Sequence, residues 1–161
     1  MEFKNDCVVK TLFSVADKLD DYLIDIEYKT KHIAYQSFGR EESALDVCER
    51  IVAQAVKRDM VRGAKVKFLE LLKTLSAADR EIILAFTSAK NPKQKKVLEM
   101  AEKFGYSRSG FYRKIAKIYE TLGKKLEKIG ITEQFWTSLL GASKFFRDSY
   151  RYMVEVVCNV A

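Results

Sequence analysis

Apolar residues recur at steps of three and four positions along nearly all of this 161-residue chain, and little interrupts them. Such spacing lines one face of an α-helix, whereas a half-buried strand needs strict alternation. Pro92 is the only proline and there are seven glycines, so long helices are permitted and a turn-rich β architecture is disfavoured. With 48% hydrophobic residues the chain can also build a core. The sequence therefore predicts an all-α fold, a helical bundle.

Residues 1–64 carry two apolar stripes and are predicted to form an antiparallel helical hairpin. A first long helix should be capped by Asn5 or Asp6 and end before Gly39. A second helix should begin after acidic residues 41 and 42, which suit a helix N-terminus, and stop near Gly63. The two stripes comprise Val8, Val9, Leu12, Leu19, Leu23 and Ile26, and then Ala44, Val47, Cys48, Ile51, Val52, Ala55 and Val56.

Residues 65–129 are predicted to form a second domain, which opens with two helices. The first is short and carries Phe68, Leu71 and Leu72. The second begins with Ser76-Ala77-Ala78-Asp79, a Ser-x-x-acid capping pattern, and buries Ile82, Ile83 and Phe86. Asn91-Pro92 should end it, because proline cannot continue a helix and restricts the residue before it.

Two more helices should complete this domain. The inward face of one is Val97, Leu98, Ala101 and Phe104, and Gly105 then supplies the left-handed residue of a tight turn. Ser107 should cap the next helix, which runs to about Ile129 and ends at Gly130. The inward residues of that helix are predicted to be Phe111, Ile115, Ile118, Leu122 and Leu126.

Residues 130–161 are predicted to form one last helix, capped by Thr132, that serves in packing or oligomerisation. Its apolar residues follow a near-heptad spacing, and the stripe is wider than one neighbouring helix would cover. We therefore expect a homodimer built mainly through this helix. The alternative is that the stripe folds back onto the Leu12–Ile26 face of the same chain. The stripe comprises Phe135, Trp136, Leu139, Leu140, Phe145, Phe146, Tyr150, Met153 and Val157.

The positive charge of the chain is concentrated in one quarter of its length. Residues 90–128 hold 12 Lys/Arg and 4 Asp/Glu, which is a net charge of +8, whereas the whole chain carries +7. A balanced protein with one basic segment has the electrostatic character of a polyanion binder, usually a nucleic-acid binder. An ordinary helical face with solvated basic side chains is the alternative.

The spacing between positions 97 and 115 fits two helices that cross at a tight turn. Such a pair needs a small residue where the helices touch, which Ala101 provides, and a turning residue four positions later, which Gly105 provides. The first two turns of the second helix then protrude. They carry Arg108, Ser109 and Arg113, whose side chains can donate hydrogen bonds to bases and phosphates.

Two segments together resemble region four of bacterial sigma factors. These are residues 75–84 (LSAADREIIL) and residues 100–115 (MAEKFGYSRSGFYRKI). The resemblance covers roughly residues 70–126, with Gly110 and Phe111 where the family usually has Thr and a smaller aliphatic residue. No stretch resembles sigma region two. The chain is therefore more similar to small phage or mobile-element transcription regulators, such as the ArpU and RinA types, which join a region-four-like module to an N-terminal helical segment.

The resemblance implies a sequence-specific regulator of transcription that binds double-stranded DNA. The helix 108–122 would read the major groove, and whether RNA polymerase is contacted is left open. The base-reading residues are expected to be Arg108, Ser109, Tyr112 and Arg113. The phosphate-binding residues are expected to be Lys93, Lys95, Ser107, Lys114 and Lys117.

An enzyme, a metal site and a cofactor are not expected. His32 is the only histidine and has no nucleophile or acid arranged with it, so a packed or solvent-facing role is favoured. Asp17, Asp20, Asp21 and Asp25 are spread over two faces of a helix, which favours solvated carboxylates over a metal site. The three cysteines, Cys7, Cys48 and Cys158, have no CxxC spacing and are expected to be buried free thiols.

The chain start has no secretory signal and the chain has no transmembrane segment, so we expect a cytoplasmic protein that does not bind membranes. Two other functions stay open. One is a phage DNA-packaging component similar to a small terminase subunit, which would form a ring-sized assembly. The other is a helical adaptor whose basic face binds acidic protein or RNA, which would not bind duplex DNA at low salt.

Overall fold

The computed structural model describes residues 2–36, 43–89 and 92–158, and this part of the chain is helical, without strands, as the apolar periodicity predicts. None of the helices in these ranges is long and apolar enough to span a membrane. In chain order the elements are α1 (Asn5–Val15), the 3-10 turn η1 (Ala16–Lys18), α2 (Leu19–Gln36), α3 (Ala44–Lys73), α4 (Ala77–Ser88), α5 (Gln94–Lys103), α6 (Arg108–Ile129), α7 (Glu133–Ala142), α8 (Lys144–Tyr152) and the π-helical turn η2 (Met153–Val157).

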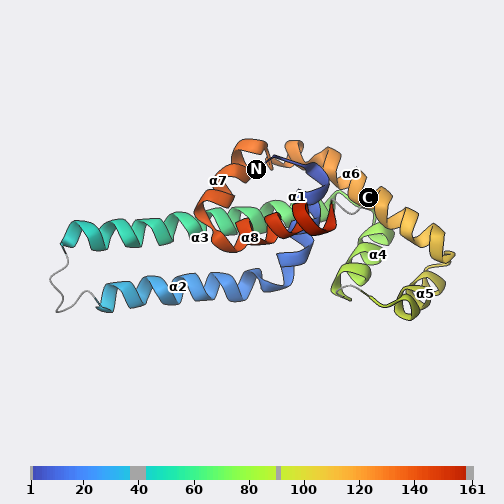
Figure 1. Ribbon diagram of the computed structural model, residues 1–161, viewed down its shortest axis with the longest axis horizontal. Coiled ribbons are helices and arrows are strands. Elements are labelled where there is room, and N and C mark those ends of the chain that lie inside the picture. The colour runs from blue at the N-terminus through green and yellow to red at the C-terminus, as the bar shows by residue number, and fades with distance from the viewer. Residues whose placement is uncertain (1, 37–42, 90–91, 159–161) are drawn as a thin grey trace.

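The molecule is elongated, and Figure 1 shows that its two ends are built from different parts of the chain. A paired arm of α2 and α3 projects at one end. At the other end α4 and α5 lie against the first part of α6. Between them is the body, in which α1 packs against α6 and α8, and α7 packs against α3 and α8.

The core of the body is organised around α1. Seven of its eleven residues are buried, and they face several sides of the helix. Phe13 packs edge-on against Phe68 of α3, with ring centroids 5.0 Å apart, and against Tyr119 of α6, at 5.8 Å. A helix that is apolar nearly all round must be surrounded by others, so α1 is the central element of this body.

The first helix is not continuous, and the prediction of one long helix from the N-terminus to Gly39 is wrong. The α-helical hydrogen bonding of α1 stops at Val15 (φ −100°, ψ −11°), and the 3-10 turn η1 leads into α2. Gly39 lies outside the described residues. The apolar spacing continues across the break because Val15 and Leu19 are both buried. The periodicity therefore did not reveal that the chain leaves the body there to enter the arm.

The predicted antiparallel hairpin of the first two long segments is confirmed as the arm of α2 and α3 (Figure 1). Arg62 of α3 donates to Glu27 of α2 at 2.8 Å, and Lys65 pairs with Asp20. The predicted helix end at Gly63 is wrong, and so is a separate helix at 68–75. Gly63 lies within the 30-residue α3, where the body covers it: a Cβ there would lie 3.8 Å from the ring of Phe135 on α7.

The helices predicted between residues 76 and 130 agree closely with the structure. Ser76 caps α4 and accepts a hydrogen bond from the backbone N–H of Asp79 at 3.2 Å. The helix ends at Ser88 and the next one starts at Gln94, while Asn91 lies outside the described residues. Val97 and Ala101 are buried as predicted, but Leu98, which was also predicted to face inward, is 43% exposed.

The C-terminal segment is two helices rather than one. Thr132 caps α7 as predicted, but Ser143 adopts an extended conformation (φ −127°, ψ 109°) that ends α7. The buried Ser143 hydroxyl accepts from the N–H of Phe146 and hydrogen-bonds with the hydroxyl of Tyr22 on α2. This break could not be predicted from the local sequence, because a serine inside a helical pattern is common.

The apolar stripe on which the expected dimer was based is largely covered within one chain. Trp136, Leu139, Phe146 and Tyr150 are buried, and α8 packs on α1. This packing is thus close to the alternative prediction, in which the stripe folds back onto the Leu12–Ile26 face of the same chain. Only the last turn, with Val157 at 38% exposed, remains open. A homodimer stays a prediction, and this stripe no longer supports it.

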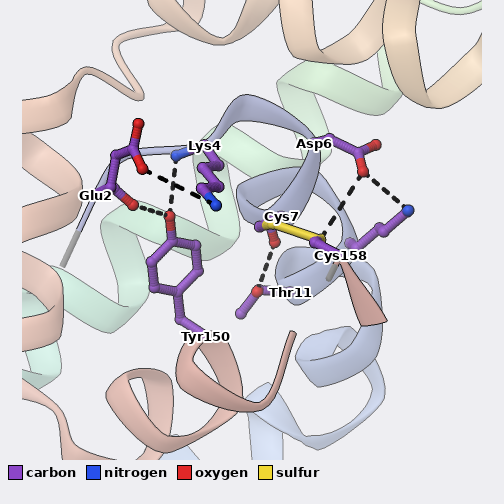
Figure 2. Close-up of a disulfide and its surroundings, with 8 residues drawn as sticks. Glu2, Lys4, Asp6, Cys7, Thr11, Tyr150 and Cys158 are labelled. Carbon is purple, nitrogen blue, oxygen red and sulfur yellow. Dashed lines mark hydrogen bonds and ion pairs between the residues drawn. A yellow bond between two sulfur atoms is a disulfide. The ribbon is translucent and has the colours of Figure 1, made fainter. Parts of the chain in front are cut away.

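The cysteines do not all remain free thiols, and that prediction is wrong for two of the three. Cys7 of α1 and Cys158 are joined in a disulfide (Figure 2). They are 151 positions apart in the sequence, so local spacing carries no information about their pairing. Cys48 is a free thiol, but it is exposed on α3 rather than buried.

The hydroxyl of Tyr150 fastens α8 to the start of the chain. It donates to the carbonyl oxygen of Glu2 at 2.6 Å and accepts from the backbone N–H of Lys4 at 3.0 Å (Figure 2). Burial raises the pKa of this hydroxyl, although the hydrogen bond from Lys4 opposes the shift. Tyr150 of α8 therefore holds the N-terminal end of the described chain, and the disulfide from Cys158 to Cys7 of α1 holds its C-terminal end.

We expect Tyr150→Phe to lower the free energy of unfolding by about 1–2 kcal/mol, because two partly buried backbone groups lose their partner. Tyr152→Phe on the same helix is the matched control, since Tyr152 is 53% exposed, and it should change stability by less than about 0.5 kcal/mol. Urea denaturation followed by circular dichroism measures both. Equal stabilities of the two variants would contradict this role of the hydroxyl.

Candidate nucleic-acid interface

The three-helix unit, defined as α4, α5 and residues 108–118 of α6, has a small aromatic core of its own. Phe111 is fully buried at its centre. The rings of Phe86, Phe104 and Tyr106 surround it, with centroids 6.1, 6.4 and 6.4 Å away. A smaller aliphatic residue would leave a void among these rings. This packing explains why a phenylalanine stands at position 111.

The turn between α5 and α6 has the geometry that its residues predict. Gly105 has a left-handed conformation (φ +79°), and the N–H of Tyr106 donates to the carbonyl of Ala101 at 2.8 Å. Ser107 then caps α6, with its hydroxyl accepting from the N–H of Gly110 at 3.1 Å. A Cβ at Gly110 would lie only 2.9 Å from that hydroxyl oxygen, so this cap favours a glycine there.

The exposed face of α6 carries the predicted polar and basic side chains. Arg108, Ser109, Arg113 and Lys117 are all exposed, while the buried residues of this helix lie on the opposite side. The three cations form no ion pair with any residue that the structure describes. They are therefore held on a rigid helix with their charges directed to solvent.

Two of the predicted contact residues on α6 also contact α4. Lys114 points toward α4, where its ammonium donates to the carboxylate of Asp79 at 2.9 Å, and this hydrogen bond raises the pKa of Lys114. Tyr112 lies at the edge of the exposed face, with its ring 6.5 Å from that of Phe86, and is 41% exposed. Both side chains thus make contacts that join α6 to α4.

The remaining predicted phosphate contacts are also exposed. Lys93 and Lys95 are exposed at the beginning of α5, and Ser107 is exposed at the beginning of α6. The hydroxyl of Ser107 accepts the capping bond but can still donate to another group. These residues come from separate helix starts of the same three-helix unit.

Sequence reasoning missed the contacts that α4 and the second half of α6 make with the end of α3. Arg80 of α4 donates to the carbonyls of Leu72 and Leu75, both at 3.2 Å. Lys125, beyond the three-helix unit on α6, donates to the carbonyl of Thr74 at 3.1 Å. These carbonyls lie at or just after the last turn of α3, where side chains commonly supply hydrogen-bond donors. A charge pattern cannot identify such contacts, because carbonyl acceptors leave no mark in the sequence.

An apolar groove between the three-helix unit and the body was also not predicted. Phe13, Leu69, Phe86, Tyr112 and Tyr119 are among its lining residues. It runs beside Tyr112, so this tyrosine borders both the groove and the exposed face of α6.

Comparison of the chain with protein-family models, with curated proteins and with solved structures finds no match.

The turn at Gly105 can be tested by substitution with alanine. A Cβ at this position would meet nothing within 4 Å, so Gly105→Ala should cost only the left-handed backbone strain, about 1–2 kcal/mol. Gly141→Ala in α7 is the control, because a Cβ there also meets nothing within 4 Å. Since Gly141 lies in a helix, alanine should raise the free energy of unfolding by about 0.5–1 kcal/mol. Chemical denaturation measures the free energy of unfolding of both variants. A Gly105→Ala variant as stable as the wild type would contradict a strained left-handed conformation at this position.

Proposed function

We propose that this chain is a double-stranded DNA-binding regulator of transcription, in which α5 and α6 act as a helix-turn-helix. The observation that carries the proposal is the exposed face of α6. Arg108, Ser109 and Arg113 occupy its first two turns, directly after a tight turn that the Phe111 core holds rigid. Helices of this kind enter the major groove with their N-terminal residues toward base edges.

Each exposed side chain has a role that its chemistry suits. Arg108 and Arg113 would each donate two hydrogen bonds to a guanine, and Ser109 would contact a base or a nearby phosphate. Lys117, one turn further along, would hold a phosphate together with Lys93 and Lys95 on α5. The net charge of +8 over residues 90–128 would draw the duplex to this end of the molecule.

The neighbours of Tyr112 and Lys114 narrow the roles proposed for them. Because Lys114 is paired with Asp79, its first function would be to fix α6 on α4, and a phosphate contact would have to compete with that carboxylate. Tyr112 would contact DNA only at the edge of the interface, since its ring also packs near Phe86. We therefore assign base reading mainly to the two arginines and Ser109.

The transcriptional outcome rests on the resemblance to sigma region four. The chain would thus act by binding a specific DNA sequence, and a contact with RNA polymerase is left open.

Binding to duplex DNA should weaken steeply as salt is raised from about 50 to 200 mM, because each phosphate contact releases a condensed counterion. Fluorescence anisotropy with a labelled duplex of genomic sequence measures this. An affinity that does not depend on salt, or a preference for RNA over the duplex of the same sequence, would refute the proposed function and favour an adaptor.

The proposed base reading distinguishes two residues on the same exposed face. Arg113→Ala should lose roughly 1–3 kcal/mol at the preferred site and reduce discrimination against other sequences. Lys117→Ala is the matched control, and it should weaken binding to all sequences by a similar factor. Both are measured on a site selected from genomic fragments and on a scrambled duplex. Identical, sequence-independent losses would reject Arg113 as a base reader.

A further inference from the structure

A small hollow lies where the arm meets the body, between α2, α3 and α8. Its volume is about 390 Å³, and sites for small molecules commonly have volumes of about 300–1,000 Å³. Each of the three helices contributes at least two of the side chains that line it, and none of them belongs to α6. The hollow is therefore separate from the helix face proposed to bind DNA.

One side of the hollow is an apolar wall, made by Tyr22 and Ile26 of α2 and Phe145 of α8. Ile26 is buried, and the rings of Tyr22 and Phe145 pack together with their centroids 4.6 Å apart. The hydroxyl of Tyr22 is hydrogen-bonded to that of Ser143 at 2.8 Å, which holds the ring in place. The wall is thus formed in advance, and it suits a small apolar group.

The other side of the hollow carries charges of both signs. Lys29 of α2 is already paired with Asp25 on the same helix, ammonium to carboxylate at 3.0 Å. Lys57 of α3, and Lys144 and Asp148 of α8, line the hollow without an ion pair to any residue that the structure describes. Two ammonium groups and one carboxylate are therefore available to a ligand.

The charged residues next to the hollow do not cancel this pattern. Glu27 and Asp59 are each paired with an arginine of α3, at 2.8 and 3.4 Å. Asp21 is exposed and does not line the hollow. The other charged residues of α8, Arg147 and Arg151, are basic. Asp148 is thus the one unpaired carboxylate among the described residues that line the hollow.

Two further groups at the hollow lack hydrogen-bond partners within the described chain. The carbonyl oxygen Oε1 of Gln54 is buried without a partner, which is uncommon for a buried polar group. In addition α8 begins at the hollow, and the backbone N–H groups of Lys144 and Phe145 donate no hydrogen bond to a described residue. The start of a helix carries partial positive charge and favours an anion.

We propose that this hollow binds a free amino acid with an apolar side chain. The ammonium groups of Lys57 and Lys144, at the positive start of α8, would hold its carboxylate. The carboxylate of Asp148 would accept from its ammonium group, and so would the Gln54 carbonyl after rotation of the amide. The side chain would pack on the apolar wall. A zwitterion fits better than a simple anion, which would leave Asp148 unpaired beside a like charge.

Thermal unfolding of the full chain tests the site without DNA, so the result is independent of the proposed function. Each common free amino acid is added in millimolar excess. One or more with an apolar side chain should raise Tm, and the shift should grow with the logarithm of ligand concentration above saturation. Glycine, aspartate and lysine should leave Tm unchanged. No shift with any amino acid, or equal shifts with all of them, would refute the site.

Two analogues of the best-binding amino acid test the charges of the ligand. One has a carboxamide in place of the carboxylate, and the other is the carboxylic acid without the amino group. By isothermal titration calorimetry each should bind about tenfold or more weakly, because one charged hydrogen bond is lost. A carboxylic acid that binds as tightly as the amino acid would show a site for anions only and would overturn the proposal.

Variants of the charged residues test which side chains hold each end of the ligand. The double variant Lys57→Gln, Lys144→Gln should weaken amino-acid binding about tenfold or more. Asp148→Asn should weaken it similarly but should not weaken binding of the carboxylic acid analogue, a difference that a structural role would not produce. Lys128→Gln, at an exposed position on α6, is the matched control.

Circular dichroism should show unchanged helicity in all of these variants, because none of the substituted residues is buried. Unchanged affinity in the double lysine variant would refute the carboxylate contacts. Equal losses of both ligands in Asp148→Asn would refute the ammonium contact.

Discussion

The burial of α1 is the interaction on which the rest of this structure depends. Its first turn crosses α6 closely: the Asn5 side-chain amide donates to the carbonyl of Gly123 at 3.1 Å, and a Cβ on Gly123 would lie 3.4 Å from that of Asn5. On another side it carries α8, to which Cys7 is linked by the disulfide. Segments from both ends of the chain therefore meet only because this short helix is apolar on several sides.

That arrangement gives α6 two separate functions. Its second half, with Leu122 and Leu126, is buried in the body, while its first half, with Phe111 and Ile115, closes the three-helix unit. The helix has 22 residues and is therefore about 33 Å long. The exposed arginines are thus positioned by a helix that is anchored far from them, and not by a loop. Such anchoring fixes the backbone positions from which these side chains project.

Local features could be predicted from the sequence, and features that depend on distant contacts could not. The caps at Ser76, Ser107 and Thr132, and the left-handed glycines at 105 and 130, follow from rules that involve only neighbouring residues. Gly63, however, lies inside a helix because α7 covers it, and Ser143 breaks one because it bonds with Tyr22. For the site, the exposed arginines follow from helix periodicity, whereas the pairing of Lys114 with Asp79 depends on how α4 packs on α6.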